Sequence, residues 1–197
     1  RVNIEITDGL ISGVHDTDIR TSDVQIDDLA GWLVLPALAE PHAHLDKTLT
    51  ADAVMNTRGD LQGAIEAEHA ALELGRTTYD GVVTRAIQAI DSLLVHGVTA
   101  IRSHVVVGGN FGTRNVAALQ EAKSHFSELI DIQLVALPIS PMTGHEGAQN
   151  RTALIEAIEA GVDLIVGITE GVPVMDTAKV VNYVKGKGVR LLGPNCP

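Results

Sequence analysis

Cysteine is almost missing from this sequence, since Cys196 is the only one among 197 residues. A single thiol excludes a disulfide within the chain and favours a reducing compartment. Basic residues are also few: 14 lysines and arginines stand against 25 aspartates and glutamates, which gives a net charge of −11. This acidity argues against general binding of nucleic acid or of anionic membranes. We therefore expect a cytoplasmic protein that binds neither.

The sequence also lacks an apolar run long enough to span a bilayer, and it contains no low-complexity segment. Its first residues read as a strand and not as a signal peptide. Hydrophobic residues nevertheless make up 45% of the chain, a proportion typical of globular proteins. The 197 residues can form one domain with a real core, but a usual (β/α)8 enzyme needs about 250.

Two kinds of pattern divide the chain. Residues 2–7 alternate between apolar and polar, and the Asp8-Gly9 pair that follows predicts a β-hairpin continuing at Leu10. Residues 24–27 read as a further short strand, and from residue 32 onward strands and helices alternate. The predicted strands cover 32–40, 99–107, 131–139, 163–168 and 189–192, and the predicted helices cover 61–74, 79–94, 115–129, 152–159 and 176–185.

This alternation predicts an α/β fold in which right-handed βαβ units build a parallel sheet of about five strands. The apolar strand at 32–40 should be buried on both faces, as strands of parallel sheets usually are. Because about five strands make only part of an eight-stranded barrel, we expect an open sheet. Its apolar edges, near 33–39 and 189–192, would be free to pair with another chain, so we also expect self-association.

A pair of histidines follows the first predicted core strand, within the segment Glu40–Lys47. His42 and His44 are two residues apart, and residues at this spacing project from the same side of a strand. Two imidazoles on one side can bind one metal ion, and the carboxyl end of a parallel strand is where α/β barrels carry their chemistry. The pair therefore predicts a Zn²⁺ or Fe²⁺ site. The alternative is a histidine pair in a surface turn.

The sequence around these histidines resembles the amidohydrolase superfamily, and within it cytosine deaminase and the related isopropylammelide-type amidohydrolases. The segments that carry the resemblance are Val34–Pro36, His42–Lys47, Gly97–Val105 and Ile130–Pro138. The resemblance covers about residues 1–165 and implies the first half of a metal-dependent (β/α)8 barrel beside a small β-domain. It also implies that His42 and His44 bind the metal. The implied reaction is deamination, or C–N bond hydrolysis, of a small nitrogen heterocycle by a metal-activated water.

A third histidine, His104, resembles the histidine of the family's second barrel strand, which implies a substrate-binding role. A hydrogen-bonded core histidine is the alternative. The chain departs from the family at Ala37, Val106 and Ile139, where a glycine, an acidic residue and a substrate-binding glutamine are usual. These departures leave the substrate open. The metal ligands and the acid/base of the later strands are missing, so we expect this chain to be inactive by itself.

The end of the chain resembles a different family, the α subunit of succinyl-CoA ligase. Residues 168–174 and 188–197 carry this resemblance, which implies that Ile168, Thr169 and Glu170 contact coenzyme A. The ligase's glycine-rich nucleotide-binding opening and its phosphorylated histidine segment are absent. The chain therefore reads as a chimera whose seam lies within 159–167. The predicted parts are an N-terminal β-strand segment at 1–31, the first half of an amidohydrolase barrel at 32–162, and a βαβ-like ligase segment at 163–197.

Three functions are compatible with these observations. The first is a truncated metal-dependent amidohydrolase, the second a coenzyme A-binding or ligase-like module, and the third a non-catalytic α/β fold. The glycine-rich segment 108–112 lacks the lysine and the spacing of a phosphate-binding loop and reads as a turn. Cys196 reads as an inert terminal thiol. The remaining histidines read as surface residues: His15, His69, His96, His125 and His145.

Overall fold

A computed structural model describes residues 2–16, 25–75, 77–139, 141–145, 147–168 and 174–193. The chain forms two compact units, Arg1–Pro36 and Ala37–Pro197. No helix in the described ranges is long and apolar enough to cross a membrane.

The first unit contains a β-hairpin of strands β1 (Asn3–Thr7) and β2 (Leu10–His15), as predicted. Asp8 and Gly9 form its turn with positive φ angles of 53° and 77°, the conformation that two-residue hairpin turns require. The strand predicted at 24–27 is wrong where the structure describes it, because residues 25–29 lie outside any strand. A strand needs a neighbour for its backbone groups, and β1 and β2 pair only with each other in the described part of the chain.

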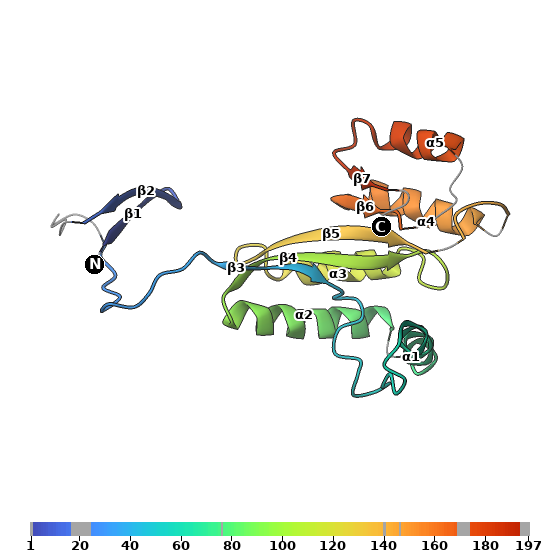
Figure 1. Ribbon diagram of the computed structural model, residues 1–197, viewed down its shortest axis with the longest axis horizontal. Helices are drawn as coiled ribbons and strands as arrows, with labels where there is room; N and C mark the ends of the chain where they lie inside the picture. The colour runs from blue at the N-terminus through green and yellow to red at the C-terminus, as the bar shows by residue number, and fades with distance from the viewer. Residues whose placement is uncertain are drawn as a thin grey trace. The chain divides into compact units, whose positions relative to one another are not determined.

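The second unit is built on a parallel sheet of five strands in the order β3-β4-β5-β6-β7 (Figure 1). This arrangement confirms the predicted α/β fold. The strands are β3 (Leu38–Ala43), β4 (Val98–Val107), β5 (Asp131–Pro138), β6 (Leu164–Val166) and β7 (Arg190–Leu192). The helices are α1 (Leu61–Glu73), α2 (Tyr79–Val95), α3 (Arg114–Ser124), α4 (Ala148–Glu159) and α5 (Val174–Val184).

The beginning of β3 differs from the prediction in two respects. Residues 32–37 are not part of the strand, which starts at Leu38 with a hydrogen bond from its N–H to the Gly97 carbonyl. The expected burial on both faces is also wrong, since Trp32 is 81% exposed and most of β3 is exposed as well. β3 lies at an edge of the described sheet, where β4 is its one described neighbour, so fewer elements surround it than surround an interior strand, and Leu38 is 57% exposed. The strand also ends later than predicted, at Ala43, which places His42 inside it and His44 directly after it.

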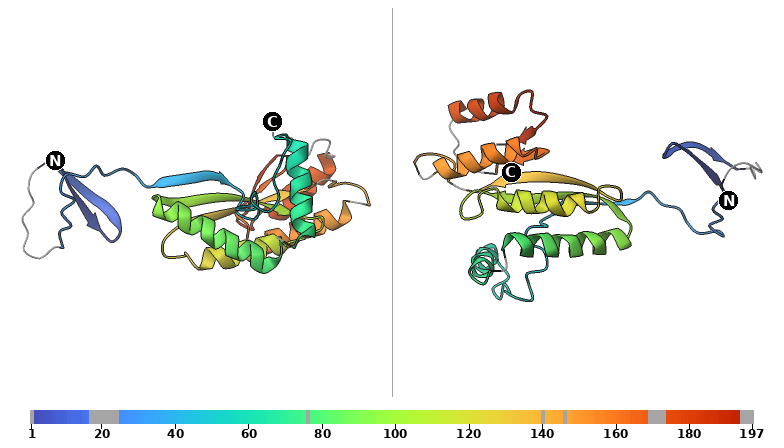
Figure 2. Two further views of the ribbon diagram at one scale, coloured as in Figure 1. Left: turned by 90° about the horizontal axis from the view of Figure 1, so that it is seen from below. Right: turned by 180° about the vertical axis from the view of Figure 1, so that it is seen from behind.

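One face of the sheet packs against the helices and forms the core. Helices α2 and α3 run side by side along the sheet (Figures 1 and 2). Every second residue of β4 and β5 points to this face, as the alternation of side chains along a strand requires. The sheet residues of this core include Ile101, Val105, Val107, Ile132, Leu134, Ala136 and Ile165, and its helix residues include Val82, Ala86, Ile90, Val116, Leu119, Ala122, Leu154 and Ala157.

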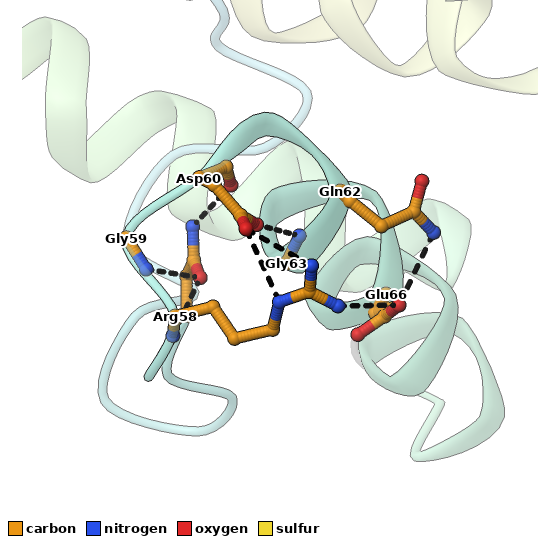
Figure 3. A network of polar contacts seen from close by, with 7 residues as sticks. Arg58, Gly59, Asp60, Gln62, Gly63 and Glu66 are labelled. Carbon is orange, nitrogen blue, oxygen red and sulfur yellow. Dashed lines mark hydrogen bonds and ion pairs between the residues drawn. The ribbon is translucent and has the colours of Figure 1, made fainter.

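A polar network fixes the start of α1, which follows the loop after β3 (Figure 3). Asp60 caps the helix by accepting a hydrogen bond from the Gly63 N–H at 2.7 Å, which satisfies one of the free donors at the helix end. Arg58 binds the other carboxylate oxygen of Asp60 and also reaches Glu66, one turn further along the helix. These groups are exposed, so the network serves to set the position where α1 begins and adds little stability.

Candidate functional site

Three imidazole rings gather where β3 and β4 lie side by side. The ring centroids of His42 and His44 are 5.3 Å apart, and those of His44 and His104 are 5.7 Å apart. The rings of His42 and His104 are stacked, with centroids 4.2 Å apart and planes 23° apart. The sequence predicted that His42 and His44 share a side, and the structure adds His104 to the same cluster.

The pairing of the two strands brings these rings together. Ala43 lies opposite Ser103, so the residues on either side of Ala43 lie near His104, which follows Ser103. The register shifts between Glu40 and Ala43: three steps along β3 match two steps along β4. The Glu40 side chain stabilises this irregular stretch by accepting a hydrogen bond from the His42 N–H at 3.0 Å.

Burial favours the neutral form of two of the three imidazoles. It is the main cause that lowers the pKa of His44 below its ordinary value, and the charges of Lys47 and His42 act in the same direction. Burial also lowers the pKa of His104, again with help from His42 and His44. Their Nδ1 atoms are buried and have no hydrogen-bond partner in the described part of the chain. A neutral imidazole nitrogen with a free lone pair is the form of histidine that binds a metal.

A buried carboxylate, Asp46, lies two residues after His44. One of its oxygens, Oδ2, accepts hydrogen bonds from the Val106 N–H at 3.1 Å and from the Asn115 amide at 3.4 Å. Desolvation raises the pKa of Asp46 to about 6, and the hydrogen bond from Val106 opposes this shift only in part. Next to it, Lys47 forms an ion pair of 2.9 Å with Glu68 of α1.

The donor set does not by itself make a complete metal site. Within the described ranges, no group of three or more His, Cys, Asp or Glu side chains is arranged to hold a metal ion. Structural zinc sites use four protein ligands and catalytic ones use three, so two histidines are a partial set. The imidazoles of His42 and His44, with ring centroids 5.3 Å apart, are the side chains available for a metal here. The metal-binding role of His42 and His44 stays a prediction.

Most other candidate residues lie apart from this cluster. Segment 108–112 is a turn, as predicted, closed by a hydrogen bond of 2.9 Å from the Gly108 N–H to the Gly112 carbonyl. Thr169 and Glu170 lie outside the described residues, and Ile168 is exposed. Of the histidines expected at the surface, His15 is half-buried beside Glu5 and the others are exposed: His69, His96, His125 and His145.

Sequence reasoning missed the residues that hold the cluster in place. Asp46 is a charged residue in a segment that carries no pattern of burial, but it is only 1% exposed. Ser103 is also fully buried and accepts a hydrogen bond from the Leu45 N–H at 3.1 Å. A signal for Ser103 exists in the sequence, because it is the one polar residue in the alternating series Ile101, Ser103, Val105 and Val107 of a core strand.

The structural neighbours of this chain are amidohydrolases. N-isopropylammelide isopropylaminohydrolase from Burkholderia multivorans matches 98% of the chain with a TM-score of 0.75 and 26% identity. 5-Methylcytosine deaminase from Klebsiella pneumoniae, solved with phosphonocytosine, matches 96% with a TM-score of 0.74 and 28% identity. The chain spans about half of these proteins, 50% and 47% of their lengths. These matches confirm the resemblance seen around His42 and His44.

A second set of relatives carries the other resemblance. The α subunit of ADP-forming succinate–CoA ligase from Staphylococcus aureus is 33% identical over 106 residues, which are 53% of this chain and 30% of the ligase subunit. The subunit from Staphylococcus epidermidis is 33% identical over 104 residues. These matches are longer than the tail segment 163–197, so part of the chain resembles both families. No family model matches the chain. By structure, the chain is therefore similar to about half of an amidohydrolase barrel. By sequence, part of it is also similar to part of a ligase subunit.

Proposed function

We propose that the second unit is the metal-binding half of an amidohydrolase-type barrel acting on a nitrogen heterocycle. In this proposal His42 and His44 bind a divalent Zn²⁺ or Fe²⁺ ion, and His104 faces the substrate. The observation that carries the proposal is the cluster of three imidazoles beside the carboxyl end of β3, whose ring centroids are at most 5.7 Å apart. The carboxyl ends of barrel strands are where such folds carry their chemistry.

In this proposal the metal ion and the protein make separate contributions to the reaction. A bound divalent ion would lower the pKa of water toward neutrality and so supply the nucleophile for hydrolysis of a C–N bond. The chain's own contribution is to present His44 in its neutral, ligand-competent form and to hold His104 nearby. A glutamate or aspartate to carry protons is needed as well. Of the described carboxylates near the cluster, Glu40 accepts a hydrogen bond from the His42 N–H, Asp46 is buried away from solvent, and Glu68 is paired with Lys47. We therefore propose that this chain does not turn over substrate by itself.

Metal analysis of the purified protein tests the metal-binding role. The double variant His42→Ala/His44→Ala should lose nearly all of the zinc or iron that the unmodified chain retains after dialysis. The matched control is His69→Ala/His125→Ala, which removes two exposed histidines outside the cluster and should leave the metal content unchanged. Equal metal in the unmodified chain and the cluster variant would refute the proposal. In the same preparations, ammonia release from cytosine should not exceed that of the metal alone.

A coenzyme A-binding or ligase-like module is the second candidate. The observation in its favour is the 33% identity to the ligase α subunit over 106 residues. Calorimetric titration with coenzyme A separates the two candidates. Saturable binding of coenzyme A together with an unchanged metal content in the cluster variant would favour the ligase-like module. Binding of neither ligand would favour a non-catalytic α/β fold.

The open sheet leads to a prediction about assembly. β3 and β7 are its edge strands, and both carry exposed apolar residues, such as Leu38 and Leu192. Because unpaired apolar edges bind other strands, we expect dimers or larger species that dissociate on dilution. Light scattering coupled to size exclusion, across a dilution series, measures this. A monomer at every concentration would show that the edges are protected in solution.

A further inference from the structure

The segment that follows His44 is attached to β4 on both sides of His104. On one side, the Leu45 N–H donates to Ser103 Oγ at 3.1 Å. On the other side, the Val106 N–H donates to Asp46 Oδ2 at 3.1 Å. Since Ser103 precedes His104 and Val106 follows it by two residues, the two hydrogen bonds bracket His104. They therefore constrain where His44 lies relative to the His104 ring.

These two contacts are buried, which makes them strong geometric constraints. Ser103 is 0% exposed and Asp46 is 1% exposed, so water cannot replace either hydrogen bond. Asn115, at 2% exposure, donates from α3 to the same Asp46 oxygen at 3.4 Å. Burying a carboxyl group is unfavourable unless its hydrogen bonds compensate. A polar side chain in this place is therefore better explained by a need for defined geometry than by stability.

Further contacts hold the continuation of the same loop. Lys47 Nζ lies 2.9 Å from Glu68 Oε2 on α1, and Arg85 Nε of α2 donates to the Thr48 carbonyl at 3.0 Å. The loop is thus tied to β4, α1, α2 and α3. A loop that only connected β3 to α1 would not need attachment to four elements.

We propose that Ser103 and Asp46 are positioning residues that fix the His44 imidazole against His104 by anchoring the loop after β3 to β4. The proposal rests on the proposed function, in which His44 is a metal ligand and His104 faces the substrate. Residues that orient metal-ligating histidines typically change metal affinity by 10–100-fold when they are removed. Neither residue contacts the metal or the substrate in this scheme.

The test reads the positions of the rings directly, without metal. NMR of histidine-labelled, metal-free protein should show contacts between the ring protons of His42, His44 and His104. Ser103→Ala and Asp46→Ala should each weaken the His44–His104 contact. Asp46→Asn should restore it, because the amide oxygen can still accept from the Val106 N–H. The matched control is Asp163→Ala. Asp163 also accepts a backbone hydrogen bond, from the Leu134 N–H at 2.9 Å. It directly precedes β6, which pairs with β5 and not with the strands that carry the histidines.

A second readout separates this proposal from the proposed function. Zinc affinity at constant pH should fall by about 10-fold in Ser103→Ala and Asp46→Ala, and stay unchanged in Asp46→Asn and Asp163→Ala. If the unmodified chain binds no zinc, the proposed function fails, while the ring contacts still decide the positioning role. Should Asp46→Ala not fold, Ser103→Ala decides the outcome, because it removes a single hydroxyl. Unchanged ring contacts in the folded variants, or an equal loss in Asp163→Ala, would overturn the proposal.

Discussion

Truncation of Leu119 to alanine is expected to lower the free energy of unfolding by about 3 kcal/mol, within the range of buried leucine truncations. Leu119 lies on α3 and is 1% exposed, in the core between the helices and the sheet. The loss has two causes: folding buries less apolar surface, and a cavity remains where the leucine side chain was. Urea unfolding at one fixed protein concentration measures it as a lower midpoint with an unchanged slope.

The matched control is Leu129→Ala, which removes the same atoms from a position that is 59% exposed, just after α3. Its effect should stay within about 0.5 kcal/mol. Two equal, small losses would mean that α3 does not pack on the sheet in solution. The comparison matters for function, because the histidine cluster depends on a second unit that folds cooperatively.

The pH dependence of stability should reveal the buried carboxyl group of Asp46. Its pKa of about 6 in the folded chain exceeds the ordinary value of 3.8, so between these values the folded state binds more protons than the unfolded state. Stability contributed by the protonated group is therefore present below about pH 4 and is lost as the pH rises through 6. The difference corresponds to about 3 kcal/mol.

Asp46→Asn isolates this contribution, because an amide has a similar shape and does not titrate in this range. Relative to the unmodified chain, the variant should gain stability between pH 4 and pH 6–7, by up to about 3 kcal/mol. His44 and His104 also change with pH, but their contributions are common to both proteins and cancel in the difference. Urea titrations of both proteins at several pH values give the two curves. Parallel curves would show that Asp46 is not buried as a titrating group.

Much of the fold follows from local patterns in the sequence. The apolar face of Tyr79–Val95 and the glycine at position 97 are enough to place α2 and its end, because both act within one element. The alternation of strands and helices fixes the parallel sheet for a similar reason. The start of β3 could not be placed this way, because an apolar run looks the same whether neighbours cover it or not. Trp32 and Leu33 show the difference, since they are apolar and exposed.

The site was predictable only in part. The spacing of His42 and His44 indicates a shared side, because side chains alternate along a strand. The stacking of His42 on His104 depends on the register between β3 and β4, which local spacing does not report. The contact from Leu45 to Ser103 joins residues 58 positions apart and is likewise invisible in the sequence pattern.

The register shift in β3 has a consequence for insertions and deletions. Glu40 lies opposite Ile101 and Ala43 lies opposite Ser103, so both pairs take the same side of the sheet although Glu40 and Ala43 are three positions apart. With uninterrupted alternation, His42 would take the side of Glu40 and enter the core. The extra residue in this stretch, which includes Pro41, inverts the parity and directs His42 and His44 to the side of His104. Deletion or insertion of one residue here would therefore move the side chains of His42 and His44 to the opposite face of the sheet. A deletion or insertion of two residues would leave them on the same face.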